Sequence, residues 1–371
     1  MTGEITIQRL LLKMQEVEAS DLHMKVGCKP VLRIGGRLFV IDADELTPES
    51  TEKLLMPIVP QHLKEALREK GGIDFSHHEG AHQRFRCSVF HAGNGLHAAI
   101  RRVNPKIPSF EELHLPPIYR RMADETHEGL VVICGVTGCG KSTTLAAMID
   151  HINEVRSENI ITVEDPVEYA MHSKKSFISQ REIGLDVPEF PLALRAAVRQ
   201  DPDVIMIGEL RDRVTMLAGI QAAETGHLVF CTLHTADTMQ SFARILEFFP
   251  QSDHAFLRSS LAAGLRGVMA QRLIPSVRPG VKVVPATEVL LSTPIVKDKI
   301  REGEDDDLPA VMSGSEHEGM HSFTNSIAKL VEDDWIDLRT AEHYAPNREA
   351  LRSRVKGIQV RAEKLVSRVK S

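Results

Sequence analysis

The first hundred residues combine one helical pattern with several short apolar runs. Between residues 6 and 18 the apolar side chains recur at the spacing of one helix face: Ile7, Leu10, Leu11, Met14 and Val17. This spacing predicts an amphipathic opening helix. Two pairs of short apolar runs follow, one around Gly35 and Gly36 and the other around residues 92–95. Both patterns are typical of β-hairpins, so we expect a mixed helix-and-strand domain over residues 1–103.

Residues 104–117 separate this block from the rest of the chain. They hold four prolines and show little periodicity. Proline disfavours both helix interiors and central strands. We therefore interpret the segment as an interdomain linker.

From about residue 128, short β-branched-rich runs alternate with helical stretches. The predicted strands are residues 130–134, 160–163, 204–207 and 228–233, and the predicted helices are residues 142–156, 192–200 and 214–225. Buried strands that alternate with helices predict a parallel sheet covered on both faces. Beyond residue 250 the pattern predicts mostly helix, with an acidic run at residues 302–307 interpreted as a solvated loop. The expected fold class is α/β, with a core domain at residues 118–290 and a helical carboxyl-terminal region at residues 291–371.

The charge balance argues against one class of function. The 371 residues include 45 Lys and Arg and 51 Asp and Glu, for a net charge of −6, whereas a dedicated nucleic-acid binder usually carries a basic surplus. No uncharged apolar stretch reaches the roughly 18 residues of a spanning helix, and the amino terminus lacks the pattern of a secretion signal. The five cysteines form no CxxC pair, which disfavours a zinc site or a disulfide framework. We expect a cytoplasmic protein.

A glycine-rich segment joins the first predicted strand and helix of the core domain. Residues 135–142 read Gly-Val-Thr-Gly-Cys-Gly-Lys-Ser and fit the P-loop pattern GxxxxGK[ST]. Its glycines let successive backbone N–H groups face a phosphate, and the following helix directs its positive end to the same place. Lys141 is expected to reach the β- and γ-phosphates of ATP, and Ser142 to hold Mg²⁺. The predicted ATP-binding residues are Gly135, Val136, Thr137, Gly138, Cys139, Gly140, Lys141, Ser142 and Thr143.

Carboxylates follow two predicted strands at the edge where the P-loop lies. The carboxyl ends of parallel strands line the ligand crevice, so Glu164 and Asp165 should face the phosphates. Glu164 is a candidate catalytic residue and a second magnesium ligand, direct or through water; the alternative is that it caps the next segment. After the next strand, Gly208 occupies the position where the metal-binding acid usually lies, and the carboxylate comes one residue later, at Glu209. This placement suits a catalytic residue that orients the attacking water. Its alternative role is an ion pair with Arg211.

Histidines bracket one of the predicted strands. His234, at the carboxyl end, is the candidate catalytic sensor of the γ-phosphate. His227 lies about 23 Å away at the other end of the strand, so the two cannot reach the same phosphate, and we expect His227 to contact another segment or subunit. His77, His78 and His82 have no second ligand cluster, and we interpret them as a solvated hairpin loop rather than a metal site.

The P-loop and four further motifs occur in the order and at the spacing of a known family. Residues 161–169 (Ile-Thr-Val-Glu-Asp-Pro-Val-Glu-Tyr) resemble its Asp box, residues 199–212 its atypical Walker B motif, residues 225–236 its His box and residues 271–275 (Gln-Arg-Leu-Ile-Pro) a later signature. Residues 19–24 and 33–38 resemble its amino-terminal domain. The chain is thus similar to the secretion-ATPase superfamily, and more closely to the PilT-like retraction ATPases of type IV pili, with the PilU-like ATPases as near neighbours.

This resemblance implies a RecA-like P-loop NTPase core preceded by a smaller, α+β, PAS-like domain. It implies a homohexameric ring with ATP bound between subunits, in which arginines of one subunit serve the ATP of its neighbour. The candidates are Arg84, Arg86 and Arg101; the alternative is that they are ordinary surface arginines of the strands. The implied function is a Mg-dependent ATPase that powers pilus retraction and twitching motility. The implied partners are an inner-membrane pilus platform protein and, for the accessory type, a paralogous retraction ATPase. The implied location is the cytoplasmic face of the inner membrane at the pilus base, and no nucleic acid is expected.

Two departures from the family pattern bear on these expectations. Val136 and Cys139 replace a proline and a serine of the P-loop, but the cradle is made of backbone, so hydrolysis should survive. Residues 294–303 keep only the Ile-Arg-Glu-Gly end of the retraction motif, which, with the basic tail, favours the PilU-like type. From the 371 residues and the lack of a CxxC pair, we expect neither the extra amino-terminal domain nor the four-cysteine insert of assembly-type relatives, which favours retraction. Two alternatives stay open: an accessory ATP-binding subunit with weak turnover, and a RecA-like nucleic-acid translocase.

Overall fold

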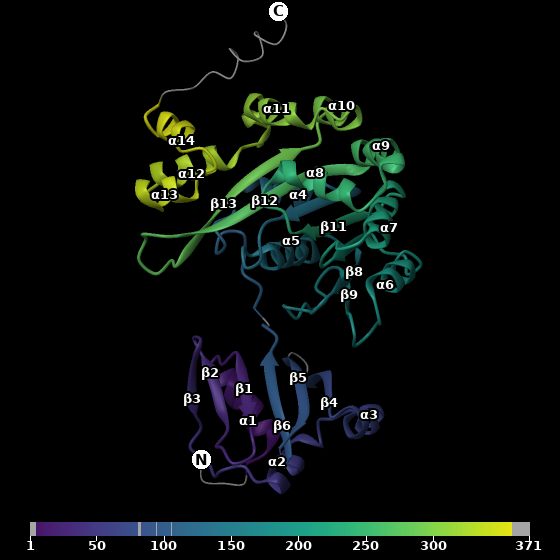
Figure 1. Ribbon diagram of the computed structural model, residues 1–371, viewed down its shortest axis with the longest axis vertical. Coiled ribbons are helices and arrows are strands. Elements are labelled where there is room, and N and C mark those ends of the chain that lie inside the picture. The colour runs from purple at the N-terminus through teal and green to yellow at the C-terminus, as the bar shows by residue number, and fades with distance from the viewer. Residues whose placement is uncertain (1–4, 81–82, 94, 105, 358–371) are drawn as a thin grey trace, which may run out of the picture. The chain divides into compact units, whose positions relative to one another are not determined.

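The computed structural model describes residues 5–80, 83–93, 95–104 and 106–357. The chain divides into two compact units (Figure 1). The first comprises residues 1–106 and 167–171, and the second comprises residues 107–166 and 172–371. The boundary at Lys106 falls within the segment expected to be a linker.

The first unit is built on an antiparallel sheet with the strand order β3-β2-β1-β6-β5-β4. Its strands are β1 (Asp21–Met24), β2 (Val31–Ile34), β3 (Arg37–Val40), β4 (Gly72–Glu79), β5 (Gln83–Ala92) and β6 (Gly95–Arg102), and its helices are α1 (Ile7–Glu16), α2 (Pro48–Leu55) and α3 (Lys64–Lys70). α1 buries the apolar face that its sequence predicts, and Thr6 caps its first turn by accepting from the Arg9 N–H at 3.3 Å. The expected mixed α+β domain is confirmed.

Both predicted hairpins form in this sheet. β2 and β3 are joined by Gly35 and Gly36, whose φ angles of 55° and 82° lie in the left-handed region that glycine adopts without strain. β5 and β6 form the second hairpin. Two local signals, a glycine pair and a glycine-containing turn, thus positioned four of the six strands.

The histidine prediction is wrong in one respect. His77 and His78 lie within β4 and not in a hairpin loop, because β4 stays paired with β5 as far as Glu79. His77 contacts the Glu79 carboxylate at 3.1 Å. His82 lies outside the described residues.

The second unit is built on a sheet with the strand order β13-β12-β7-β11-β10-β8-β9. Its strands are β7 (Gly129–Cys134), β8 (Asn159–Glu164), β9 (Phe177–Glu182), β10 (Val204–Ile207), β11 (Leu228–Leu233), β12 (Leu265–Pro275) and β13 (Val283–Leu291). All neighbours are parallel except the antiparallel β12–β13 pair. Every residue of β7, β10 and β11 is buried, as expected for strands covered on both faces. The four predicted strands and the α/β class are confirmed.

Helices alternate with these strands as expected. α5 (Lys141–Val155), α6 (Phe190–Ala197) and α7 (Arg213–Glu224) confirm the three predicted helices. The others are α4 (Pro117–Glu125), α8 (Thr238–Glu247), α9 (His254–Gly264), α10 (Pro294–Glu302), α11 (Leu308–Gly314), α12 (Phe323–Glu332), α13 (Leu338–Tyr344) and α14 (Arg348–Val355). Among the described residues, no helix combines the length and the apolar composition that crossing a membrane requires.

The prediction of mostly helix beyond residue 250 is wrong for part of that region. α9 is followed by the long β12–β13 hairpin, and helices resume only at Pro294. β12 pairs with β7, which lies far earlier in the chain, so no local pattern signals this strand. Pro285 is tolerated because β13 is an edge strand, where one side of the backbone needs no hydrogen-bond donor.

The acidic run at residues 302–307 is also more than a solvated loop. Asp305–Asp307 form a short 3₁₀ helix, and the Asp305 carboxylate accepts from both Nη atoms of Arg258, at 2.8 and 2.7 Å. A bidentate pair of this kind fixes orientation as well as distance. The run is therefore tied to α9.

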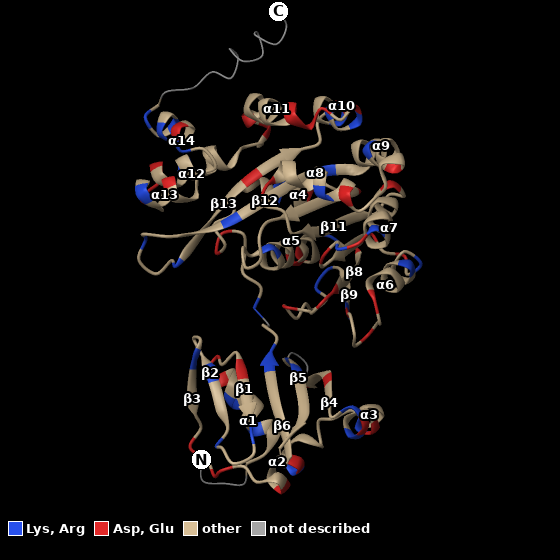
Figure 2. Cartoon of the chain, viewed as in Figure 1, with Lys and Arg blue, Asp and Glu red and all other residues tan. Residues whose placement is uncertain are grey.

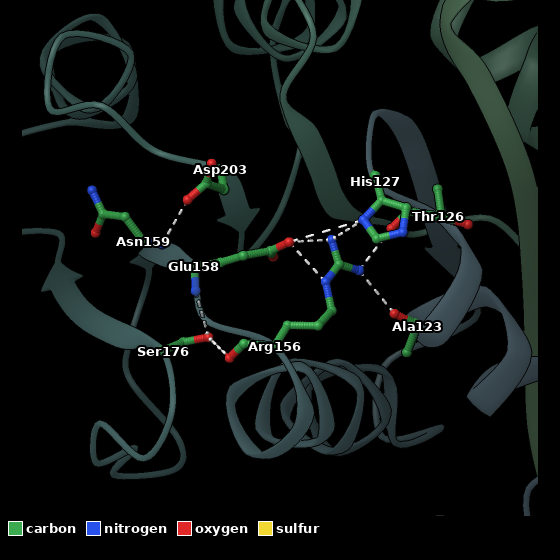
Figure 3. Close-up of polar contacts among 8 residues, drawn as sticks. All are labelled: Ala123, Thr126, His127, Arg156, Glu158, Asn159, Ser176 and Asp203. Carbon is green, nitrogen blue, oxygen red and sulfur yellow. Dashed lines mark hydrogen bonds and ion pairs between the residues drawn. The ribbon is translucent and has the colours of Figure 1, made fainter.

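A polar cluster lies at the amino-terminal end of β8, at the edge of the sheet opposite the P-loop (Figure 3). Arg156, the residue after α5, donates to the carbonyls of Ala123 and Thr126 at 3.0 and 2.8 Å, and to the Glu158 carboxylate at 2.8 Å. Both carbonyls lie at the end of α4, where a helix has no internal donors left. One side chain, at the end of α5, thus joins the end of α4 to the residue that precedes β8.

Candidate nucleotide site

The P-loop connects the carboxyl end of β7 to the first turn of α5. Gly135, Gly138 and Gly140 have φ angles of 152°, 79° and 88°, in the region that glycine alone adopts readily. A Cβ at Gly135 would also lie 2.6 Å from the backbone oxygen of Gln271. The loop therefore turns tightly around the amino terminus of α5, where unpaired N–H groups and the helix dipole favour an anion.

Lys141 occupies the centre of this loop. Its Nζ donates to the carbonyl oxygens of Gly135 and Val136, at 2.8 and 3.2 Å, and its side chain is buried. The ammonium group thus lies where a P-loop holds phosphate oxygens. Ser142 and Thr143 follow in the first turn of α5 and are half-buried.

Glu164 ends β8 at the same edge of the sheet, as its strand position predicts. Its Oε1 accepts from the Thr162 hydroxyl at 2.6 Å and from Nε2 of Gln180 at 3.0 Å. The carboxylate is buried, and these donors orient it. Asp165, the next residue, is exposed and accepts from Nη1 of Arg211 at 3.4 Å.

Glu209 follows β10 and joins two of the other candidates. Its Oε2 lies 2.7 Å from Nη2 of Arg211, and its Oε1 lies 3.3 Å from Nε2 of His234. The hydrogen bond from Arg211 to Glu209 raises the pKa of the guanidinium further. The ion pair considered as an alternative role for Glu209 is therefore present, and a second oxygen still faces the nucleotide loop through His234.

His234 completes the chain of contacts to the P-loop. Its Nδ1 lies 3.3 Å from the Thr137 hydroxyl, so the imidazole stands between Thr137 and Glu209. His227 directly precedes β11, at the end opposite His234, and its Nδ1 lies 2.9 Å from the carbonyl oxygen of Ala222 in α7. The structure therefore brings His234 to the nucleotide loop and not His227.

The three candidate arginines belong to the sheet of the first unit. Arg86 on β5 is paired in register with Arg101 on β6. Nε of Arg101 donates to Asp21 at 2.8 Å, and burial would raise the pKa of that carboxyl, but Ser20 and Arg101 outweigh burial and lower it. The Arg101 side chain is nevertheless 68% exposed. Arg84 is buried and donates through Nε to a serine hydroxyl on β4 at 3.2 Å.

Comparison with known proteins places these features in a family. Residues 69–317 match the model of the family described as type II/IV secretion system protein. The chain belongs to this family. It is 37% identical to the type IV pilus ATPase PilU of Pseudomonas aeruginosa over 94% of this chain and 91% of the relative, and 35% identical to the type IV pilus retraction ATPase PilT of that organism over 91% of this chain and 98% of the relative.

Solved structures agree with this membership of the type II/IV secretion family. The crystal structure of the pilus retraction motor PilT with bound ADP superposes with a TM-score of 0.84 at 38% identity, covering 94% of this chain and 99% of that one. The resemblance to PilT-like and PilU-like ATPases is thereby confirmed. The fold class predicted with it, an ATPase core preceded by a smaller domain, is confirmed as well.

This member of the secretion family also carries polar residues at the site whose role the sequence pattern left unassigned. Gln271 on β12 contacts the P-loop, and its neighbour Arg272 donates to the carbonyl of Ala236, in the loop after β11, at 3.2 Å. Both belong to the segment Gln-Arg-Leu-Ile-Pro, in which two adjacent polar residues follow the apolar run of residues 268–270. The available signal was the resemblance of this segment to a family signature.

Proposed function

We propose that this chain is an ATP-hydrolysing motor that works as a homohexamer and powers the retraction of type IV pili. One observation carries the proposal: His234 links the Glu209 carboxylate to Thr137 of the P-loop. A phosphate cradle and an oriented carboxylate thus meet at one edge of the sheet. Hydrolysis of a nucleoside triphosphate needs these two parts, since its catalysis is mainly positioning and charge stabilisation.

The P-loop would hold the triphosphate. Lys141 would exchange the carbonyls of Gly135 and Val136 for β- and γ-phosphate oxygens, which carry more negative charge. Mg²⁺ prefers oxygen ligands, and the Ser142 hydroxyl and Glu164 carboxylate at this edge fit that preference. Bound there, Mg²⁺ would neutralise charge that develops on the phosphates.

Glu209 would orient the water that attacks the γ-phosphorus. Arg211 and His234 each hold one of its carboxylate oxygens, so the side chain has a defined direction before the reaction. The oxygen of water forms the new bond to phosphorus, and the bond from phosphorus to the bridging oxygen of ADP breaks. His234 would hold Glu209 in register with the P-loop through Thr137.

The assembly proposed around this site is a ring in which each subunit contributes to its neighbour. Arg84, Arg86 and Arg101 are the candidates that would neutralise the transferred phosphoryl group of the next subunit; of these, Arg101 offers the exposed guanidinium. The proposed partners are the inner-membrane platform protein of the pilus and, for an accessory motor, a paralogous retraction ATPase. The proposed location is the cytoplasmic face of that membrane at the pilus base.

A second candidate is an accessory ATPase with weak turnover of its own. The similarity to PilU, at 37% identity, is as great as the similarity to PilT, at 35%, and favours neither. A nucleic-acid translocase has less support. Lys and Arg are interspersed with Asp and Glu over the helices of the second unit (Figure 2), and the net charge is −6.

Steady-state ATP hydrolysis with Mg²⁺ tests the proposal. Wild type should turn over; Lys141→Ala should lose nucleotide binding; and Glu209→Gln should bind ATP but hydrolyse it about 10²- to 10⁴-fold more slowly. Glu247→Gln is the matched control, because Glu247 is exposed and forms an ion pair with Arg244 on the surface of α8. Wild type that binds ATP without hydrolysing it would favour the accessory candidate. Equal rates for Glu209→Gln and Glu247→Gln would contradict the role given to Glu209.

A further inference from the structure

We propose that Gln271 is a positioning residue of the nucleotide site, whose side-chain amide holds the Cys139–Gly140 peptide so that the Gly140 N–H points into the phosphate cradle. The inference rests on the proposed nucleotide binding and deepens it. It assigns a function to a strand that the P-loop pattern does not include.

Strand register brings Gln271 to the P-loop. β12 runs parallel to β7, with Ala270 opposite Cys134 at the end of their paired residues. The residue that follows β7 is Gly135, the first of the loop, and the residue that follows Ala270 within β12 is Gln271. A Cβ on Gly135 would lie 2.6 Å from the Gln271 backbone oxygen. The loop is therefore seated directly on this residue.

The Gln271 amide is buried and has both of its ends satisfied. Gln271 is only 1% exposed, and burying its amide without hydrogen-bond partners would cost several kcal/mol of folding free energy. Its Nε2 donates to the Cys139 carbonyl at 2.5 Å, and its Oε1 accepts from the Thr144 hydroxyl at 2.9 Å. Thr144 lies in the first turn of α5 and is itself buried. One side chain thus bridges the loop and the helix from a third element.

Peptide geometry gives this bridge its consequence. The peptide unit is planar and trans, so the carbonyl of Cys139 and the N–H of Gly140 point in opposite directions. With the carbonyl held outward on Gln271, the N–H faces the inner side of the loop, where a P-loop binds phosphate oxygens.

The loop needs such an external restraint. Gly138 and Gly140 both have positive φ, at 79° and 88°, and glycine populates positive and negative φ about equally. Rotation of the Cys139–Gly140 peptide would turn a carbonyl oxygen toward the phosphates and replace attraction by repulsion. Gln271 opposes that rotation.

The chemistry requires glutamine. The site needs one donor and one acceptor on the same rigid group, facing Cys139 and Thr144 respectively. Glutamate keeps the acceptor for Thr144 but places an oxygen, instead of an N–H donor, against the Cys139 carbonyl. Methionine is of similar size but supplies neither the donor nor a strong acceptor. The pair Gln271→Glu and Gln271→Met therefore separates the donor from the volume of the side chain.

The test is titration with a fluorescent ADP analogue, together with KM and kcat for ATP. Gln271→Glu and Gln271→Met should weaken ADP binding about tenfold or more and raise KM in parallel, while kcat changes by less than about threefold. KM should change and kcat should not, because the cradle binds the phosphates equally well in the ground state and in the transition state. Gln221→Met, an exposed position on α7, is the control and should match wild type.

Circular dichroism and thermal unfolding show which variants fold. ADP affinity within twofold of wild type in a folded Gln271→Glu or Gln271→Met overturns the proposal, and so does a fall in kcat with unchanged KM. If neither folds, Thr144→Val decides, because it removes one of the two bonds that orient the amide: weaker ADP binding supports the proposal, and unchanged binding overturns it. Wild type that binds no ADP would instead refute the proposed function.

Discussion

Nε2 of His234 lies 3.3 Å from Oε1 of Glu209, so the residues that follow β11 and β10 are in direct contact. The other nitrogen of the ring lies 3.3 Å from the Thr137 hydroxyl. The imidazole thus fixes the distance between the P-loop and the carboxylate proposed to orient water. Hydrolysis depends on this distance because the water must approach the γ-phosphorus in line with the bond that breaks.

Substituting His234 should affect hydrolysis more than binding. His234→Ala leaves the phosphate cradle intact but frees Glu209 on one side, and a misplacement of about 1 Å can cost about 100-fold in rate. We expect kcat to fall about 10- to 100-fold, with the affinity for ADP changed by less than about threefold. A steady-state assay of phosphate release measures kcat, and titration with ADP measures the affinity. His317→Ala, at an exposed position, should behave as wild type; a loss of ADP affinity in His234→Ala equal to its loss of rate would refute this division of roles.

The sequence sufficed for the parts of the fold that local patterns encode. The P-loop, the four strands from residue 130 to residue 233 and the helices between them follow from apolar runs, glycines and helical spacing. The β12–β13 hairpin does not, because β12 exists through its pairing with β7, and its Gln271 and Arg272 interrupt the strand pattern. Pairing between distant segments leaves no local signal of its own.

The candidate site was predictable to the same extent. Glu164, Glu209 and His234 each follow a predicted strand, and parallel strands bring their carboxyl ends to one edge. The contacts among them depend on side-chain rotamers, which a sequence does not specify. Arg211 is an example: in the structure it pairs with Glu209 and also contacts Asp165. From the sequence, the pair with Glu209 could be given only as an alternative to the catalytic role of Glu209.

Arg156 should matter for stability and little for the chemistry. Arg156→Ala removes the donors to Ala123, Thr126 and Glu158 (Figure 3), and breaking a largely buried pair typically costs about 3–5 kcal/mol of unfolding free energy. Urea unfolding measures the loss, and kcat of the folded variant should stay close to that of wild type. The comparison is Arg301→Ala, whose exposed pair with an aspartate one turn earlier on α10 is worth about 0.5 kcal/mol or less. Equal losses in the two variants would contradict the prediction.

His321 should make the second unit less stable in mild acid. Burial lowers the pKa of its imidazole, although the hydrogen bond to the Gly319 carbonyl and the carboxylates of Glu288 and Glu316 act in the opposite direction. Its Nε2 lies 2.8 Å from the Thr287 hydroxyl and its Nδ1 3.2 Å from the Gly319 carbonyl, so the neutral ring has both nitrogens satisfied.

The direction of the effect follows from proton uptake. Below the ordinary histidine pKa of 6.5, the unfolded chain takes up a proton at His321 that the folded chain does not, so stability falls as the pH falls from there to the lowered pKa. Urea unfolding at pH 7.5 and pH 5.5 should show a smaller difference in His321→Gln than in wild type. His317→Gln, at its exposed position, should keep the wild-type difference. An unchanged difference in His321→Gln would show that its titration is not coupled to folding.

Mixing two inactive variants tests whether Arg101 acts on the neighbouring subunit. Removing an arginine that serves the phosphoryl group in trans costs about 10³-fold or more, so Arg101→Ala and Lys141→Ala should each be inactive alone. In mixed rings about a quarter of the sites pair an intact P-loop with an intact Arg101 from the next subunit, and ATP hydrolysis should reappear in proportion. Lys141→Ala mixed with Glu209→Gln is the matched control, because both defects lie in the same unit of one subunit and no mixed site is whole. Recovery no greater than in that control would show that Arg101 does not serve its neighbour.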